Sequence, residues 1–140
     1  DEQRWDHLGG PGAAIQVVSR EAEAMARIAF EETILQGATL ARTAVIMPSD
    51  RAVAEYIAGH PEAIGYISLA STREGIRVIA IDGVLPTQAA LADGRYPLAH
   101  PLSIVTRTIV PGKTSDFVDF VLGREGQRIV EQRCVPIPPG

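Results

Sequence analysis

The stretch AIQVVSREAEAMAR, residues 14–27, decides the fold of this 140-residue chain. Residues 14–18 form a short apolar run between a Gly-Pro-Gly turn and a charged segment, which predicts a buried strand. Residues 21–36 have apolar side chains at helical spacing, so a helix should follow, with Gly37 as its left-handed cap. On that helix Glu23, Arg27 and Glu31 lie four residues apart and can form ion pairs.

The same alternation continues along the chain. Residues 43–47 (TAVIM) predict a second strand, and Pro48-Ser49 then offers the N-cap of a helix that Gly59 closes. Residues 64–69 and 76–81 are two further short apolar runs separated by a polar turn, which favours two more strands. Repeated alternation of strand and helix is typical of an α/β sheet covered by helices.

The last third of the chain predicts a short helix over residues 86–92, capped by Gly94, and a strand over 102–110. A helix should follow with Thr114 or Ser115 as its cap and Phe117 facing inward together with Phe120 and Val121. Gly123 should break that helix before a second helical piece that extends through Ile129 and Val130. The whole length fits one domain with one core.

Composition and charge exclude several classes of protein. The net charge is −4 and the basic residues form no run, so nucleic acid is not an expected partner. No apolar run has the length of a membrane span, and the amino-terminal residues lack the pattern of a signal sequence. Compartment is therefore not encoded in these residues.

No pattern of catalytic or metal-binding residues stands out. His7, His60 and His100 are scattered without metal-ligand spacing, and the single Cys134 cannot form an internal disulfide. The glycine-rich turn precedes the first strand rather than following it, so it is not a dinucleotide-binding loop. We expect neither an enzyme nor a cofactor or metal site.

A series of short motifs follows one another at fixed spacing: PEAIGYIS (61–68), IDGV (81–84), YPL (96–98) and EGQ (125–127). In order and spacing they resemble the second half of the phosphate-type solute-binding proteins of ABC importers. The resemblance implies a periplasmic-binding-protein-like α/β lobe with a mixed sheet flanked by helices. It also implies an extracytoplasmic location, a small oxyanion such as phosphate as ligand, no catalysis, and the membrane subunits of an ABC transporter as partners.

That family has two lobes around a cleft, and the resemblance assigns residues 1–96 to the second lobe. Residues 97–140 match the segment that returns to the first lobe, whose opening strands are not in this sequence. Three arrangements follow: an isolated fragment, strands supplied by a partner chain, or a rearranged one-domain fold. We favour a partial or partner-completed chain, because an unpaired sheet edge invites association, and self-association is therefore a further expectation.

In the family the first strand leads into an Arg-Glu-x-Gly-Ser-Gly-Thr-Arg loop that holds the anion at a helix N-terminus. The resemblance therefore assigns ligand binding to Arg20, Ala24, Met25, Ala26 and Arg27. This chain replaces Gly-Ser-Gly-Thr by Glu-Ala-Met-Ala, so two donor hydroxyls are absent, each worth about 1.5–3 kcal/mol toward a charged ligand. Arg20 is either an anion clamp or an ion-paired residue. The alternative function is an interaction or assembly module that keeps the fold without transport.

Overall fold

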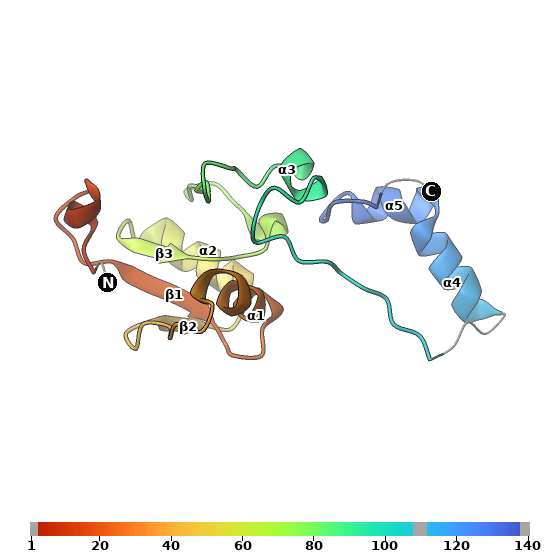
Figure 1. Cartoon of the computed structure of the whole chain (residues 1–140), viewed down its shortest axis with the longest axis horizontal. Helices are drawn as coiled ribbons and strands as arrows, with labels where there is room; N and C mark the ends of the chain where they lie inside the picture. The colour runs from red at the N-terminus through yellow and green to blue at the C-terminus, as the bar shows by residue number, and fades with distance from the viewer. Residues whose placement is uncertain (1–2, 108–111, 138–140) are drawn as a thin grey trace. The chain divides into compact units, whose positions relative to one another are not determined.

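The computed structural model describes residues 3–107 and 112–137. The chain divides into two compact units, residues 1–80 and residues 81–140, which are treated separately below. The first unit contains a parallel sheet with a helix on each face, and the second contains the remaining helices (Figure 1). The α/β class is therefore confirmed, whereas the proposed division at residue 96 stays a prediction.

Three parallel strands form the sheet of the first unit, in the order β2-β1-β3. The central strand β1 (Gln16–Arg20) pairs with β2 (Val45–Met47) in a register that sets Arg20 opposite Met47. On its other side β1 pairs with β3 (Ala63–Gly65), with Val18 opposite Gly65. The first three predicted strands are thus confirmed, with shifted or shorter bounds.

Two helices cover the sheet because the chain crosses it in opposite directions. The helix α1 (Met25–Phe30) continues into one π-helical turn, η2 (Glu31–Leu35), and leads from β1 to β2. The helix α2 (Asp50–Gly59) leads from β2 across to β3. Since parallel crossovers are right-handed, these two connections place α1 and α2 on opposite faces, in front of and behind the strands in Figure 1.

The ends of these helices agree in part with the sequence. Ser49 is the N-cap of α2, and its hydroxyl accepts a hydrogen bond from the Ala52 amide at 3.1 Å, as predicted. The predicted left-handed turn is present too, with Gln36 at φ +46° and Gly37 at φ +93°. The predicted start of the first helix at residue 21 is wrong, because residues 21–24 form a turn before α1.

The core of the first unit lies between the sheet and α2. Val18, Val53 and Ala54 are completely buried, and the buried Ser19 is next to them on β1. Gly65 of β3 allows the close approach of the helix. A Cβ atom there would lie 2.8 Å from the Val18 carbonyl oxygen and 3.2 Å from Val53 Cγ1. This contact is short because β3 has no side chain at that position.

The amino-terminal segment is attached to the same sheet. A 3-10 turn, η1 (Trp5–Leu8), ends at Gly9, whose φ is +80°. The indole Nε1–H of Trp5 donates to the Glu62 carbonyl at 2.9 Å, just before β3. A second 3-10 turn, η3 (Leu69–Ser71), follows β3.

The second unit is helical in its described part. The helix α3 (Gln88–Ala92) is capped by the Thr87 hydroxyl, which accepts from the Ala90 amide at 3.1 Å. The helices α4 (Lys113–Leu122) and α5 (Arg124–Val130) pack on each other and are separated at Gly123, as predicted. The N-cap of α4 is Gly112 rather than Thr114 or Ser115.

Two predicted strands are wrong or lie partly outside the described residues. Residues 76–81 form no strand, and only Ile81 makes an isolated bridge, to Val84 around the turn at Asp82-Gly83. Residues 102–107 also form no strand, and 108–110 lie outside the described residues. Apolar alternation favours a strand only where a neighbouring backbone offers hydrogen bonds, and among the described residues neither run pairs with a neighbouring strand.

The predicted inward face of α4 is likewise wrong for its two phenylalanines, while Val121 is half-buried. Phe117 is 59% exposed and Phe120 is 45% exposed, although both sit at helical spacing. The periodicity marks an apolar stripe correctly, but it does not supply the surface that would bury it. None of the helices in the described residues is long and apolar enough to cross a membrane.

Candidate functional site

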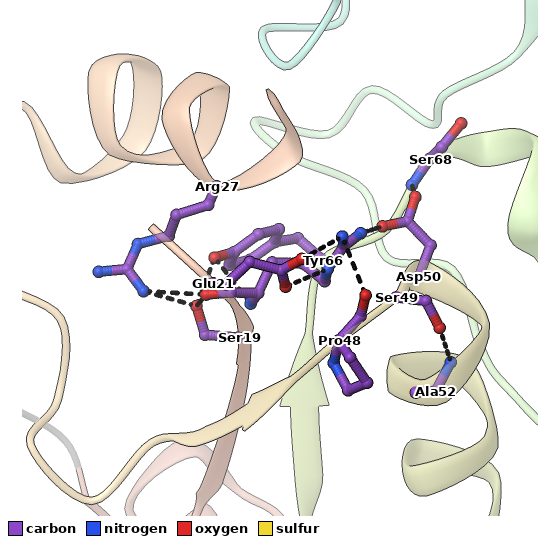
Figure 2. Close-up of polar contacts among 10 residues, drawn as sticks. Ser19, Glu21, Arg27, Pro48, Ser49, Asp50, Ala52, Tyr66 and Ser68 are labelled. Carbon is purple, nitrogen blue, oxygen red and sulfur yellow. Dashed lines mark hydrogen bonds and ion pairs between the residues drawn. The ribbon is translucent and has the colours of Figure 1, made fainter. Parts of the chain in front are cut away.

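The carboxyl ends of all three strands lie at one edge of the sheet, and the polar contacts of the first unit gather there (Figure 2). From β1 the chain crosses to β2, on one side of the central strand, and from β2 it crosses back to β3, on the other side. The two connections therefore lead away from each other at the ends of β1 and β3. Ligands of open α/β sheets bind at such a divergence, outside the carboxyl ends of the strands. Arg20 ends β1 at this point and Tyr66 follows β3.

Arg20 makes ion pairs with two carboxylates. Its Nε and Nη2 donate to the two carboxylate oxygens of Glu21, each at 3.0 Å, in a bidentate arrangement. Its Nη1 pairs with Asp50, and Nη2 also lies 3.5 Å from the Pro48 carbonyl. The hydrogen bond to Glu21, opposed by partial burial and aided by Asp50, raises the pKa of Arg20. The guanidinium therefore stays charged and is held in one orientation.

The two carboxylates are held differently. Asp50 is the first residue of α2, and its second oxygen accepts the Ser68 amide at 2.9 Å. Its side chain is only 18% exposed, so it joins the ends of the strands rigidly. The Glu21 side chain is 42% exposed, and Arg20 is its only side-chain partner among the described residues. The hydrogen bond from Arg20 lowers the pKa of Glu21.

Arg27 connects α1 to the end of β1. Its Nη1 donates to Ser19 Oγ at 2.9 Å and to the Arg20 carbonyl at 3.3 Å. Its Nε donates to Glu31 at 2.6 Å, which confirms the predicted pairing of these two residues. The side chain is only 14% exposed, so Arg27 serves as a cross-link between helix and strand.

A buried hydroxyl pair completes this network. Ser19 Oγ lies 2.5 Å from the Tyr66 hydroxyl and also donates to the Arg20 carbonyl at 3.2 Å. The Tyr66 ring stacks on Phe30 of α1 with 4.3 Å between ring centroids. Through these contacts α1, β1 and the segment after β3 are held together behind Arg20.

The structure brings the predicted site residues together in sequence order around the turn from β1 to α1. Ala24 is the N-cap of α1 with extended backbone, and Met25 and Ala26 are its first two residues. The side chain of Met25 is mostly exposed, at 56%. Within the described residues the amides of Met25 and Ala26 make no hydrogen bond, as is usual in a first helical turn.

Several residues of this site escaped the sequence analysis. Asp50 was not singled out, although it follows the strand that pairs with β1 and so had to lie near Arg20. Tyr66 belonged to a motif whose role was not assigned. Ser19 carried no signal at all, because its role depends on contacts across the sheet.

Residues 2–125 match the family model described as a PBP superfamily domain. The chain belongs to the PBP superfamily. This PBP superfamily chain spans about half the length of the curated relatives it matches, and the resemblance to phosphate-type solute-binding proteins is confirmed.

The relatives of this PBP superfamily chain are phosphate-binding proteins. It is 36% identical over 124 residues to Phosphate-binding protein PstS 2 of Streptococcus pneumoniae, covering 83% of this chain and 43% of that protein. It is 28% identical over 138 residues to Phosphate-binding protein PstS of Bacillus subtilis, covering 96% of this chain and 46% of that one. These are proteins named for binding, not for catalysis.

Solved structures agree with the fold. A putative phosphate ABC transporter substrate-binding protein from Clostridium perfringens, solved with bound phosphate, matches with a TM-score of 0.85 and 29% identity over 98% of this chain and 58% of that one. The phosphate-binding protein of a phosphate ABC transporter from Streptococcus pneumoniae matches with a TM-score of 0.74 and 35% identity, covering 84% of this chain and 49% of that one. The PBP superfamily chain therefore has the fold of substrate-binding proteins.

Proposed function

We propose that this chain is a solute-binding domain of an ABC importer and binds a small oxyanion such as phosphate without chemical conversion. The observation that carries the proposal is the position of Arg20, a guanidinium fixed at the carboxyl end of the central strand, where the chain turns into α1 and the first helical amides, those of Met25 and Ala26, are uncommitted within the described residues. The names of the relatives, and the phosphate in one related structure, support phosphate as the first ligand to test.

The proposed binding residues are those that the resemblance assigned, in two different roles. Arg20 and the amides of Met25 and Ala26 form the side toward the anion, because guanidinium and amide donors suit oxyanion oxygens, whereas Ala24 shapes the turn through its amide, which donates to the Glu21 carbonyl at 3.0 Å. Arg27 keeps β1 and α1 in place, since its donors already contact Ser19, Glu31 and the Arg20 carbonyl. This division of roles separates residues that bind from residues that position.

The electrostatics of the site favour weak binding. Glu21, Asp50 and Glu31 form ion pairs with only two guanidiniums, so the cluster is net negative before any anion arrives. The loop also lacks the two hydroxyls found at the corresponding positions of the family motif. We therefore expect a lower affinity for phosphate than a Gly-Ser-Gly-Thr loop would give.

Partners and location follow from the same proposal. A solute-binding domain of an importer works outside the cytoplasmic membrane and delivers its ligand to the transporter's membrane subunits. Self-association stays a prediction. The alternative of a non-transporting interaction module has no support among the relatives, which are named as phosphate-binding proteins.

Isothermal titration of the purified protein with phosphate, sulfate and other oxyanions tests the proposal. Arg20→Ala should weaken phosphate binding by about 10- to 100-fold, because each lost charge-assisted hydrogen bond is worth about 1.5–3 kcal/mol. Arg51→Ala is the control, since Arg51 pairs with Glu55 on the exposed surface of α2. Equal affinities in the two variants, or no heat from any oxyanion in the parent protein, would refute the proposal.

A further inference from the structure

Two carboxylates pair with the guanidinium of Arg20, and one of them is held in place more firmly than the other. Asp50 is fixed at the first turn of α2 and by the Ser68 amide, so it cannot leave without disturbing the ends of two strands. Within the described residues Arg20 is the only side-chain partner of the Glu21 carboxylate, and the Glu21 side chain is 42% exposed. If an anion comes to Arg20, Glu21 is therefore the group that moves.

We propose that the Glu21 carboxylate occupies the anion-binding edge of Arg20 and determines both the affinity and the charge preference of the site. This inference rests on the proposed function and adds a competing group within the chain to it. An incoming oxyanion must displace Glu21 from Nε and Nη2 before it can contact the guanidinium.

The geometry of the contact supports direct competition. The Nε and Nη2 edge of a guanidinium presents two parallel N–H groups, which fit carboxylate and tetrahedral oxyanions alike. Glu21 satisfies both N–H groups at 3.0 Å, the distance expected of such bonds. The remaining nitrogen, Nη1, is committed to Asp50. Arg20 thus has no other edge with two free donors.

Charge preference follows from where Glu21 goes after displacement. Its carboxylate is joined to Arg20 through the adjacent backbone, so it stays near the anion and repels it. The lowered pKa of Glu21 means that this group remains ionised at neutral pH and keeps competing. Repulsion acts more strongly on a dianion than on a monoanion. The site should therefore discriminate against doubly charged ligands.

A pair of matched variants tests this inference by titration with inorganic phosphate at neutral pH. Glu21→Gln should bind phosphate about fivefold tighter than the parent protein, because the competing ion pair of an exposed carboxylate is removed. Glu55→Gln is the control: Glu55 is also nearly half exposed and also pairs with an arginine, Arg51, but this pair lies on the exposed surface of α2, outside the Arg20 site. Circular dichroism and urea denaturation would establish that both variants fold.

The outcomes separate the two proposals. Tighter binding by Glu21→Gln with little change in Glu55→Gln supports the inference, and so does phosphate binding that appears only in Glu21→Gln. An equal gain in both variants overturns it, because general charge reduction would then explain the effect. If the parent protein binds phosphate and Glu21→Gln binds it no more tightly, this inference alone is overturned. If none of the three proteins binds phosphate, the proposed function is overturned as well.

Discussion

The hydroxyl of Tyr66 lies 2.5 Å from the hydroxyl of Ser19, and this contact joins the segment after β3 to the carboxyl end of β1. The contact also connects α1 to the site, because the Ser19 hydroxyl accepts a hydrogen bond from Arg27 and the Tyr66 ring stacks on Phe30 of α1. Ser19 is completely buried, so water cannot replace a missing partner. The pair is therefore a structural support of the Arg20 site.

Removing this hydroxyl should measurably destabilise the first unit. We expect Tyr66→Phe to lower the free energy of unfolding by about 1 kcal/mol, because one buried hydrogen bond is lost while the stacked ring remains. Urea denaturation would measure it. The control is Tyr56→Phe, since the Tyr56 hydroxyl makes no hydrogen bond within the described residues. Similar losses in the two variants would contradict the assignment.

Gly65 should tolerate no side chain. A Cβ there would lie 2.8 Å from the Val18 carbonyl and 3.2 Å from Ile57 Cδ1, so Gly65→Ala should cost about 1–3 kcal/mol of overpacking. Gly59→Ala is the matched control, because nothing lies within 4 Å of its Cβ position and alanine suits a helix better than glycine. Thermal unfolding should separate them, and a stable Gly65→Ala protein would show that the strand and α2 can move apart.

Two arginine–glutamate pairs at i, i+4 differ mainly in burial, and this allows a clean comparison. Arg27→Gln should lower the free energy of unfolding by about 1–3 kcal/mol, because Arg27 also serves the buried Ser19 hydroxyl. Arg51→Gln should leave the free energy of unfolding almost unchanged, since that arginine is 85% exposed. If denaturant midpoints shift equally, Arg27 is not the cross-link between α1 and β1.

The carboxyl titration of Glu21 should report its contact with Arg20. The guanidinium lowers the pKa of Glu21, so the contact adds stability above the unfolded-state pKa of about 4.3 and loses it as pH falls through the folded value. NMR titration should find this pKa depressed in the parent and raised in Arg20→Gln. Arg51→Gln should leave it unchanged while raising the pKa of Glu55, which Arg51 lowers. If the pKa of Glu21 were the same in the parent protein and in Arg20→Gln, the ion pair between Glu21 and Arg20 would not exist in solution.

The sequence predicted the first unit well because its signals are local. Strands that follow turns, the Ser49 cap and the left-handed turn after η2 each depend on a few neighbouring residues. The turn between β1 and α1 was placed correctly for the same reason, while its role in ligand binding stays a prediction. The Asp82-Gly83 turn is another local signal, and both residues have positive φ.

The errors concern features that depend on distant partners. Residues 76–81 and Phe117 were assigned from alternation and helical spacing, but neither pattern says which surface lies opposite. The site shows the same limit. For Arg20 the sequence left two interpretations, an anion clamp or an ion-paired residue. Its pairing with Asp50 depends on β1 and β2 lying side by side, which the sequence alone does not show.

The parallel sheet keeps its stability and its recognition in separate places. Val18, Val53 and Ala54 form the interior, while residues 21–26 lie beyond the strand ends and add little to it. Mutations in that turn can accumulate with small effects on folding. Selection for ligand choice can therefore act on the turn almost independently of selection for stability. A Gly-Ser-Gly-Thr cradle could thus be exchanged for Glu-Ala-Met-Ala during evolution without passing through an unfolded intermediate sequence.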